Sequence, residues 1–464
     1  MLFNSLIFVV FASVFFLIFR RVKHNTFARL TFIVIMSAFF YGWWDWWYLL
    51  LLFGTGWIDY TAAKLMVAYP ARRKLLLWFS MLMNLGVLGA FKYSAFFASN
   101  INLLLNADSK IPVVQYALPL GISFYTFQSM SYTIDVYRGH CAPARNLLHF
   151  FAGLLLFPQL VAGPVLRASQ ILPQLLEEPH TTEAQRWDGL KLIVHGYFKK
   201  LVIADNLSYA IVGAFGGISL PQSSAYWWMI VSMFAFQIYC DFSGYTDIAR
   251  GLAKWMGYEF PLNFNHPYAA TSLRDFWARW HISLSTWFRD YVYIPMGGSK
   301  CGPIRAHFNM WTSMLLSGFW HGADWKFIIW GALHAAYLSL ERITAWPALL
   351  VRNPVGRVIA TVFVLLQVWV AWVFFRAEST AQALQIIRIM FSFSSDAYPN
   401  LQPQLSFLVL GAVYELFMAL KPEIDSNRRG RWMDWLEPAR IALLVTVCIF
   451  LRGPAQIKFI YFQF

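Results

Sequence analysis

The sequence predicts an all-α protein that crosses a membrane many times, and three observations lead to this fold class. Apolar residues make up 59% of the 464-residue chain and charged residues only 13%, about half the charged share of a soluble domain. The apolar residues form long runs, and the basic residues stand in short clusters between those runs. No internal repeat is visible, so we expect one integral membrane domain over residues 1–464.

The apolar runs predict roughly eleven transmembrane helices, accompanied by re-entrant and interfacial helices. The first run, 2–19, has neither a basic leading region nor a small-residue cleavage site, so we interpret it as a span and not as a signal peptide. The clearest further spans are 27–44, 49–67, 75–91, 147–160, 225–239, 358–375, 405–420 and 441–451. An amphipathic piece near 381–391 lies between two of them.

Basic clusters predict the orientation of these spans. One cluster, 20–29, follows the first span, and a second, 72–74, follows the third. The positive-inside rule places both in the cytoplasm and therefore the N-terminus outside, and the basic loop 421–431 is also expected in the cytoplasm. Because the net charge of +14 resides in such clusters, we exclude nucleic acid as a partner.

Three segments are too polar or too irregular for simple lipid-facing helices. Pro119 and Gly121 interrupt segment 116–139, which is either a buried irregular helix or the lining of a wet cavity. Segment 189–215 contains His195, Lys199, Lys200 and Asp205, and it is expected to pack inside the protein or to lie partly at the surface. Segment 161–175 is predicted to be an amphipathic interfacial piece that follows a helix end at Gly163 and Pro164.

Asp241 and Asp247 stand six residues apart in a helical pattern. At that spacing they do not share one helix face, so we do not interpret them as a paired-carboxylate site. We expect them to make polar contacts with Arg250 or with backbone, and Asp241 to cap a helix.

The stretch 274–334 combines strongly polar residues with dense aromatics, which no other part of the chain does. Its guanidinium groups could grip phosphates or carboxylates. The alternative is that these arginines form internal salt bridges with Asp275 and Asp290. For any single arginine, we favour a salt bridge over ligand binding. The candidate substrate-binding residues in this stretch are Arg274, Arg279, Trp280, Arg289, Asp290 and Trp320.

Two histidines of this stretch, His281 and His321, each follow a tryptophan and are the candidate catalytic residues. An ionisable residue at membrane depth is costly and usually functional. As an alternative, Gly318 and Gly322 form a small-residue pair suited to close helix packing, and His321 could then simply bond to a neighbouring helix. For His334, the roles of core histidine and site member are equally open.

No other catalytic constellation is visible in the sequence. The four cysteines are scattered, and neither they nor the histidines have metal-ligand spacing, so no bound metal or cofactor is expected. No serine or cysteine stands in a nucleophile motif, and Ser283 and Ser317 are weak candidates.

Several long segments resemble the membrane-bound O-acyltransferase family. The chain is most similar to the branch that contains the bacterial alginate O-acetyltransferase membrane subunit. The segments are PLGISFYTFQSMSYTIDVYRG, FPQLVAGPVLR, DFSGYTDIARGLAKWMG, NFNHPYAATSLRDFWARWHISLSTWFRDYVYIPMGG, SGFWHGADWKFIIWGALH and the terminal FIYFQF. The resemblance implies less closely matching spans in 1–110, a catalytic core in 116–346 and C-terminal spans in 354–464.

The resemblance also implies a fold and roles for residues. Family members form a ring of tilted helices around a thinned centre, with a funnel from each side of the bilayer. The family's characteristic histidine falls on His321 and its second polar position on His281. We expect His321 to act as general base and His281 to orient or polarise, since His281 stands in a polar segment that could reach water and His321 in an apolar one.

Donor, partners and location follow from the same resemblance. The expected donor is acetyl-CoA from the cytoplasm, and the expected acceptor is a polysaccharide or a carrier. Expected partners are an extracytoplasmic acetyltransferase, a polysaccharide synthase complex and membrane lipids, at a bacterial inner membrane. Two other classes stay open: a transporter or flippase for a saccharide or lipid-linked precursor, and a non-catalytic anchor of a soluble acetyltransferase.

Overall fold

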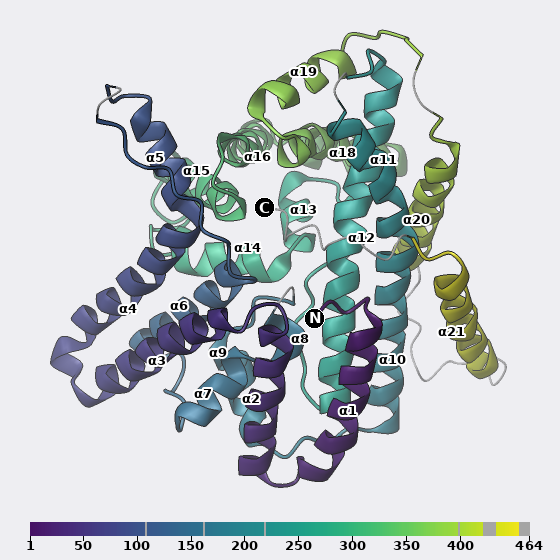
Figure 1. Cartoon of the computed structure of the whole chain (residues 1–464). Coiled ribbons are helices and arrows are strands. Elements are labelled where there is room, and N and C mark those ends of the chain that lie inside the picture. Colours follow the sequence, from purple (N-terminus) through teal and green to yellow (C-terminus); the bar gives the residue numbers. More distant parts are fainter. Residues whose placement is uncertain (107–108, 161–162, 218–219, 398–399, 421–432, 454–464) are drawn as a thin grey trace. The chain divides into compact units, whose positions relative to one another are not determined.

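The computed structural model describes residues 1–106, 109–160, 163–217, 220–397, 400–420 and 433–453. All regular elements in these residues are helices, and no strand occurs among them (Figure 1). The predicted all-α fold is therefore confirmed. The predicted cytoplasmic loop 421–431, the matching terminal segment 459–464 and two positions of segment 161–175 lie outside the described residues.

The chain divides into two compact units. Unit 1 comprises Met1–Ile193 and Ile248–Pro261, and unit 2 comprises Val194–Asp247 and Leu262–Phe464. Unit 1 contains the helices α1 (Leu6–Val22), α2 (Thr26–Gly42), α3 (Trp47–Ala68), α4 (Arg73–Leu88), α5 (Ser94–Asn102), α6 (Ile122–Arg138), α7 (Leu147–Leu154), α8 (Phe157–Leu160) and α9 (Ala168–Leu176). It also contains the start of α10 (Glu183–Tyr197) and the end of α12 (Ser224–Met256).

The first four predicted spans correspond to α1–α4, with ends shifted by a few residues. Side chains set the starts of α1 and α2: Ser5 accepts from the N–H of Phe8 at 3.2 Å, and Asn25 accepts from that of Ala28 at 3.0 Å. Such caps satisfy backbone N–H groups that have no partner inside the helix.

The predicted break before α6 is present. Gly121 precedes the helix with a φ of +72°, and a Cβ added there would lie 2.8 Å from the carbonyl oxygen of Leu160. Only glycine adopts this backbone at little cost and tolerates such an approach. Nearly all side chains of α6 are buried, which favours the interpretation of segment 116–139 as a buried irregular helix.

One buried carboxylate joins three helices of unit 1. Asp59 of α3 is fully buried. It accepts from Ser80 of α4 at 2.5 Å, from the Asn84 amide of α4 at 2.8 Å, and from Ser129 of α6. A buried carboxylate is tolerated when donors of this kind surround it, so polar contacts hold α3, α4 and α6 in register.

Unit 2 begins within α10 and contains most of α12. Its other helices are α11 (Asp205–Phe215), α13 (Leu273–Arg279), α14 (Ile282–Phe288), α15 (Pro303–His321), α16 (Trp325–Thr344), α17 (Trp346–Leu350), α18 (Pro354–Arg376), α19 (Thr380–Met390), α20 (Gln402–Leu420) and α21 (Met433–Phe450). The predicted span 225–239 is only the first half of α12, a single helix of 33 residues.

Lys200 explains why α12 continues through its acidic stretch. Lys200 lies on a π-helical turn, η4 (Phe198–Ala204), and its ammonium is 2.7 Å from the carboxylate of Asp241 and 2.8 Å from that of Asp205. All three side chains are at most 3% exposed. The expectation that Asp241 caps a helix is wrong, because its charge is balanced by a lysine from another element and no helix end is needed.

Lys199 makes the equivalent contact for the second aspartate of α12. Its ammonium is 2.6 Å from the carboxylate of Asp247. The expected partner of Asp247 was Arg250 or backbone, whereas the ion pair that the structure shows is with Lys199. Segment 189–215 packs inside the protein at Lys200 and Asp205 and lies partly at the surface at Tyr209 and Val212, which agrees with the prediction.

Helices α15 and α16 approach each other at glycines. A Cβ on Gly318 would lie 2.2 Å from the carbonyl oxygen of Phe327, and one on Gly331 would lie 2.4 Å from that of Met314. Gly318 therefore has the close-packing role that its small-residue spacing indicated. This role positions the end of α15, where His321 lies.

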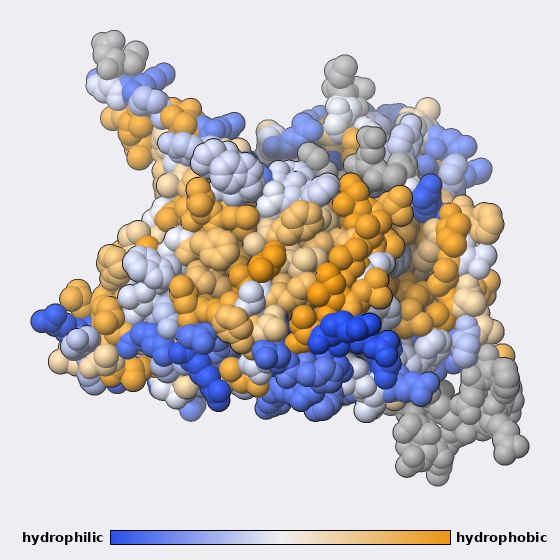
Figure 2. Space-filling model, turned by 60° about the horizontal axis from the view of Figure 1, so that its bottom comes forward, coloured by the Kyte–Doolittle hydropathy of each residue, from blue (hydrophilic) through white to orange (hydrophobic). Residues whose placement is uncertain are grey.

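Three helical stretches are long and apolar enough to cross a membrane by length and composition: Pro70–Asn102, Pro354–Arg376 and Gln402–Leu420. Thr26–Gly42 is a shorter apolar helix. Figure 2 shows apolar side chains covering broad connected areas of one face, as a lipid-facing surface requires. The number of spans, the ring and the funnels stay predictions.

We expect Lys200→Met to lower the free energy of unfolding by about 3–5 kcal/mol, since removing one partner leaves charges buried without their cation. Denaturant unfolding of the full chain in one detergent measures this. Lys254→Met is the matched control, because Lys254 forms a 2.8 Å pair with Glu259, whose side chain is 57% exposed. Exposed pairs contribute about 0–1 kcal/mol, so similar losses in both variants would contradict the role of Lys200.

Candidate active site

The α13–α14 junction positions His281. Its backbone has a φ of +42° and a ψ of +53°, the left-handed conformation that few residues other than glycine adopt. Non-glycine residues in this conformation concentrate at functional sites, where surrounding structure holds them. The chain reverses at this point, and its α14 side is anchored to a loop that precedes α13.

Asn263 is the anchor in that loop. Its backbone carbonyl accepts from the N–H of Ile282 at 2.9 Å. Its side-chain oxygen accepts from the hydroxyl of Ser283 at 2.8 Å and from the N–H of the same residue at 3.1 Å. Asn263 is 1% exposed, so these bonds are shielded from water and fix the backbone on which His281 stands.

His281 is buried against aromatic rings. It is 1% exposed, and its ring centroid lies 4.7 Å from that of Phe242 and 6.4 Å from that of Trp320. We expected the polar segment around His281 to reach water and His321 to lie in apolar surroundings. The expectation is wrong for His281, because both side chains are buried and His321, at 6% exposed, is no less exposed than His281. The sequence between arginines is polar, but the left-handed turn directs this side chain into the core.

His321 is the last residue of α15 and lies in an aromatic enclosure. The ring centroids of Trp320, Trp330 and Phe375 are each 5.0–5.1 Å from its own. Trp320 therefore contacts both His321 and His281. The structure brings the two candidate catalytic histidines, 40 residues apart in sequence, to the same indole ring.

His334 belongs to the same cluster. It is fully buried, with its ring centroid 4.8 Å from that of Trp330 and 5.0 Å from that of Trp277. Neither ring nitrogen has a hydrogen-bond partner within the part of the chain that the structure describes. Trp330 thus lies against both His321 and His334. This position suits His334 either as a member of the site or as a core histidine.

The arginines of the stretch divide between ion pairs and a cavity. Arg279 pairs with Asp275 at 2.7 Å, and Arg289 pairs with Asp290 through two contacts of 2.6 and 3.1 Å. The internal salt bridges considered from sequence are therefore present for both. Arg274 is exposed at the start of α13.

Arg274 and Arg289 border a cavity of about 580 Å³ in unit 2. Serine, threonine and methionine side chains form much of its wall. Its other lining residues are Trp277, Ala278, Ile282, Ser285, Thr286, Phe288, Tyr293, Met310, Ser313, Met314, Ser317 and Leu338. Two cations and a mostly uncharged wall suit an elongated ligand with an anionic group.

One face of α15 leads from this cavity to His321. Met310, Met314 and Ser317 line the cavity and follow one another at helical spacings of four and three residues. His321 comes four residues after Ser317 and continues the same stripe. The cavity therefore runs along the helix face that ends at the candidate base.

Trp280 and Trp320, both predicted to bind substrate, lie in the aromatic core instead of the cavity wall. Trp280 is 1% exposed, stacks on Phe276 with centroids 5.6 Å apart, and contacts Trp372 at 5.0 Å. Trp320 is 4% exposed. Sequence reasoning missed Asn263 and the wall residues of α15, although the helical spacing of Met310, Met314 and Ser317 is visible in the sequence.

Among the described residues, no group of three or more His, Cys, Asp or Glu side chains is placed to hold a metal ion. The groups available for chemistry at this site are buried imidazoles, hydroxyls and guanidiniums.

The described residues thus form an all-helical protein with buried imidazoles and a cavity lined by two arginines. Residues 68–349 match the family described as MBOAT, membrane-bound O-acyltransferase. The chain belongs to this family and is an O-acyltransferase.

Curated relatives extend the similarity over the whole chain. A probable alginate O-acetylase AlgI of Pseudomonas putida is 36% identical, covering 93% of this chain and 94% of the relative. A peptidoglycan O-acetyltransferase of Helicobacter pylori is 32% identical, covering 100% and 98%. A teichoic acid D-alanyltransferase of Bacillus subtilis is 31% identical over 47% of this chain and 58% of its own length.

We expect Asn263→Ala to lower the rate of acyl transfer about tenfold or more, because a displacement of about 1 Å at a reacting group is enough for such losses. Asn265→Ala is the matched control, because Asn265 lies in the same loop and is exposed. Its backbone N–H bonds to the carbonyl of Arg279, and the substitution keeps this bond. Turnover at equal expression is the measurement. Equal rates in both variants would show that Asn263 does not position the site.

Proposed function

We propose that this protein transfers an acetyl group from cytoplasmic acetyl-CoA toward O-acetylation of a polysaccharide outside the membrane, with His321 as the general base. One observation carries the proposal: the stripe of α15 that lines the arginine-bordered cavity ends at the buried ring of His321. Family membership supports the acyl transfer itself.

The cavity in unit 2 is the proposed donor site. The phosphates of coenzyme A would lie at Arg274 and Arg289, where guanidinium groups make forked contacts to phosphate. The flexible thiol arm would follow the wall formed by Ser313, Met314 and Ser317. This arrangement directs the thioester along α15 toward His321.

The proposed chemistry needs one base. The neutral imidazole of His321 accepts the proton of the acceptor hydroxyl while the hydroxyl oxygen attacks the thioester carbonyl. The C–O bond forms, the C–S bond breaks, and the departing sulfur takes the proton back from the imidazolium. A neutral imidazole, which can accept a proton and return it, suits this cycle, and His281 orients the reacting groups from the other side of Trp320.

The acceptor is proposed to be a polysaccharide hydroxyl or a carrier that delivers the acetyl group to one. The names of the relatives support a glycan acceptor, since they describe alginate and peptidoglycan O-acetylation. We propose that an extracytoplasmic acetyltransferase and a polysaccharide synthase complex act with this subunit.

The proposed location is a bacterial inner membrane, with the N-terminus outside and residues 20–29 in the cytoplasm. The basic clusters support this orientation. A cysteine introduced at Lys23 should therefore be labelled by an impermeant reagent only after the cells are opened. Labelling of this cysteine in intact spheroplasts would show that the orientation is the opposite of the one proposed.

We expect His321→Ala to lower transfer by about 10²–10⁴-fold, the contribution of a general base, and His281→Ala to leave more residual transfer. Single-turnover transfer from labelled acetyl-CoA, with all variants at equal expression, is the measurement. His334→Asn is a matched control, because it alters a buried histidine of the same aromatic cluster.

Five results would change the assignment. Near-normal transfer by His321→Ala would remove its role as base, and a dead His281 variant beside an active His321 variant would exchange the roles. Equal losses in all three histidine variants would indicate loss of the aromatic packing and not of a base. Flux of a saccharide without transfer would favour a transporter, and the absence of both would favour a non-catalytic anchor.

We expect Arg274→Gln combined with Arg289→Gln to raise the KM for acetyl-CoA about tenfold or more and to change kcat much less, because the two guanidiniums bind a distant part of the donor. The control Arg388→Gln removes an exposed cation of α19 that does not line the cavity. An unchanged KM would place the donor elsewhere.

A further inference from the structure

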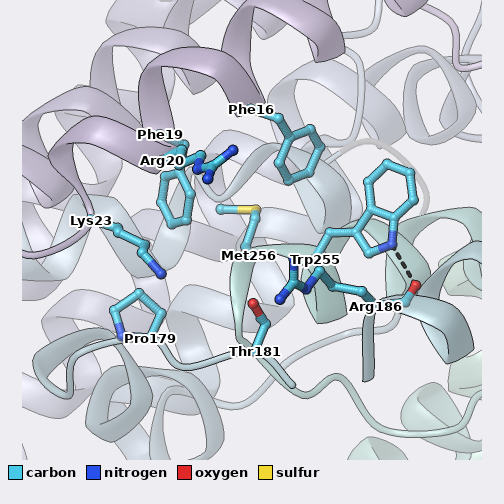
Figure 3. A pocket seen from close by; sticks show the side chains of 9 residues that line it. All are labelled: Phe16, Phe19, Arg20, Lys23, Pro179, Thr181, Arg186, Trp255 and Met256. Atoms are coloured by element: carbon cyan, nitrogen blue, oxygen red, sulfur yellow. Dashed lines mark hydrogen bonds between the residues drawn. The ribbon is translucent and has the colours of Figure 1, made fainter. Parts of the chain in front are cut away.

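Unit 1 contains a second cavity that acyl transfer does not use. It has a volume of about 350 Å³ and lies where α1 ends, between the segment after α9 and the end of α12. Figure 3 shows the side chains of Arg20, Lys23 and Arg186 around one space. All charged residues in its lining are cationic, so the cavity is suited to an anion.

Two acidic side chains near this cavity in sequence are engaged with other residues. Glu178 lies 2.6 Å from a ring nitrogen of His24, whose hydrogen bond holds the pKa of that carboxyl below its usual value. Glu259, three residues beyond Met256, pairs with Lys254 at 2.8 Å. The cations of the cavity therefore do not depend on these carboxylates for neutralisation.

The wall opposite the cations is apolar and rigid. Phe16 of α1 meets Trp255 of α12 edge-to-face, with centroids 5.5 Å apart. The indole N–H of Trp255 donates to the backbone carbonyl of Arg186 at 2.8 Å, which is the dashed bond in Figure 3. This bond ties the chain segment that carries one cation to the aromatic wall.

Exposed apolar side chains continue from the cavity along α1. Val14, Leu17 and Ile18 are 44%, 72% and 41% exposed and lie within two turns before Arg20. Their exposure next to cations is typical of a surface at the boundary between hydrocarbon and headgroups. A free phosphate would use the cations but not this apolar face.

We propose that the cavity binds the headgroup of an anionic phospholipid. Its phosphate lies among Arg20, Lys23 and Arg186, and its acyl chains lie along the exposed face of α1. The charge of the cavity complements the phosphate, and the apolar residues of α1 complement the chains. This site is independent of the acyl-transfer proposal, because it uses none of the residues assigned there.

The test uses the full chain in detergent, titrated with dioleoyl phosphatidylglycerol or dioleoyl phosphatidylcholine and analysed by native mass spectrometry. The cavity variant carries Arg20→Gln and Lys23→Gln. The control carries Arg72→Gln and Lys74→Gln, which remove the same charge at exposed positions outside the cavity. We expect phosphatidylglycerol binding to weaken about tenfold or more in the cavity variant, given the contribution of each cation, and to stay unchanged in the control.

Arg186→Gln provides a second cavity variant, on a different helix from Arg20 and Lys23. The substitution keeps the backbone carbonyl of residue 186, which accepts the hydrogen bond from Trp255. It should weaken phosphatidylglycerol binding as well, and phosphatidylcholine should bind weakly and equally to all proteins. Equal binding of phosphatidylglycerol to wild-type and cavity variants would overturn the proposal. Displacement of the bound lipid by coenzyme A, dependent on Arg20 and Lys23, would overturn the lipid assignment in favour of a nucleotide phosphate.

Discussion

The interior of unit 2 depends on the charge of Lys200. Its ammonium lies within 2.8 Å of two carboxylates on different helices, and all three groups are shielded from water. In a low-dielectric interior an isolated charge is very unfavourable, so the three groups are stable there only together. This ion-pair cluster lets α12 run unbroken from Ser224 to Met256 and carry Phe242, which packs on His281.

The same constraint shapes the candidate active site, where aromatic rings take the place of water around the imidazoles. Trp320 contacts both His281 and His321, and Trp330 contacts both His321 and His334. Such packing excludes solvent that would compete for a proton or hydrolyse a thioester. The cationic residues stay at the border of the cavity, where a charged donor can reach them from water.

The two cavities differ in how their cations are used. In unit 2, Arg289 shares its charge with Asp290, which suits a donor that must leave after each turnover. In unit 1, the cations stand beside an apolar helix face and an aromatic wall, which suits a lipid that stays.

The sequence by itself determined the helical class, the membrane location and the acyltransferase family. These rest on apolar runs and on long contiguous motifs, which are local properties of the chain. It also identified His281 and His321, because rare polar residues stand out against an apolar background. Gly121 was recognisable because it interrupts a helical pattern next to Pro119, and Gly318 because it forms a small-residue pair with Gly322.

Only the tertiary structure decided which polar residues meet. The partners of Asp241 and Asp247 are lysines 41 and 48 residues away, and no spacing rule connects them. The burial of His281 follows from a left-handed turn held by Asn263, so its polar sequence neighbours were a poor guide to its surroundings. The division of the arginines between ion pairs and a cavity border likewise depends on distances between elements, which a linear pattern of residues does not contain.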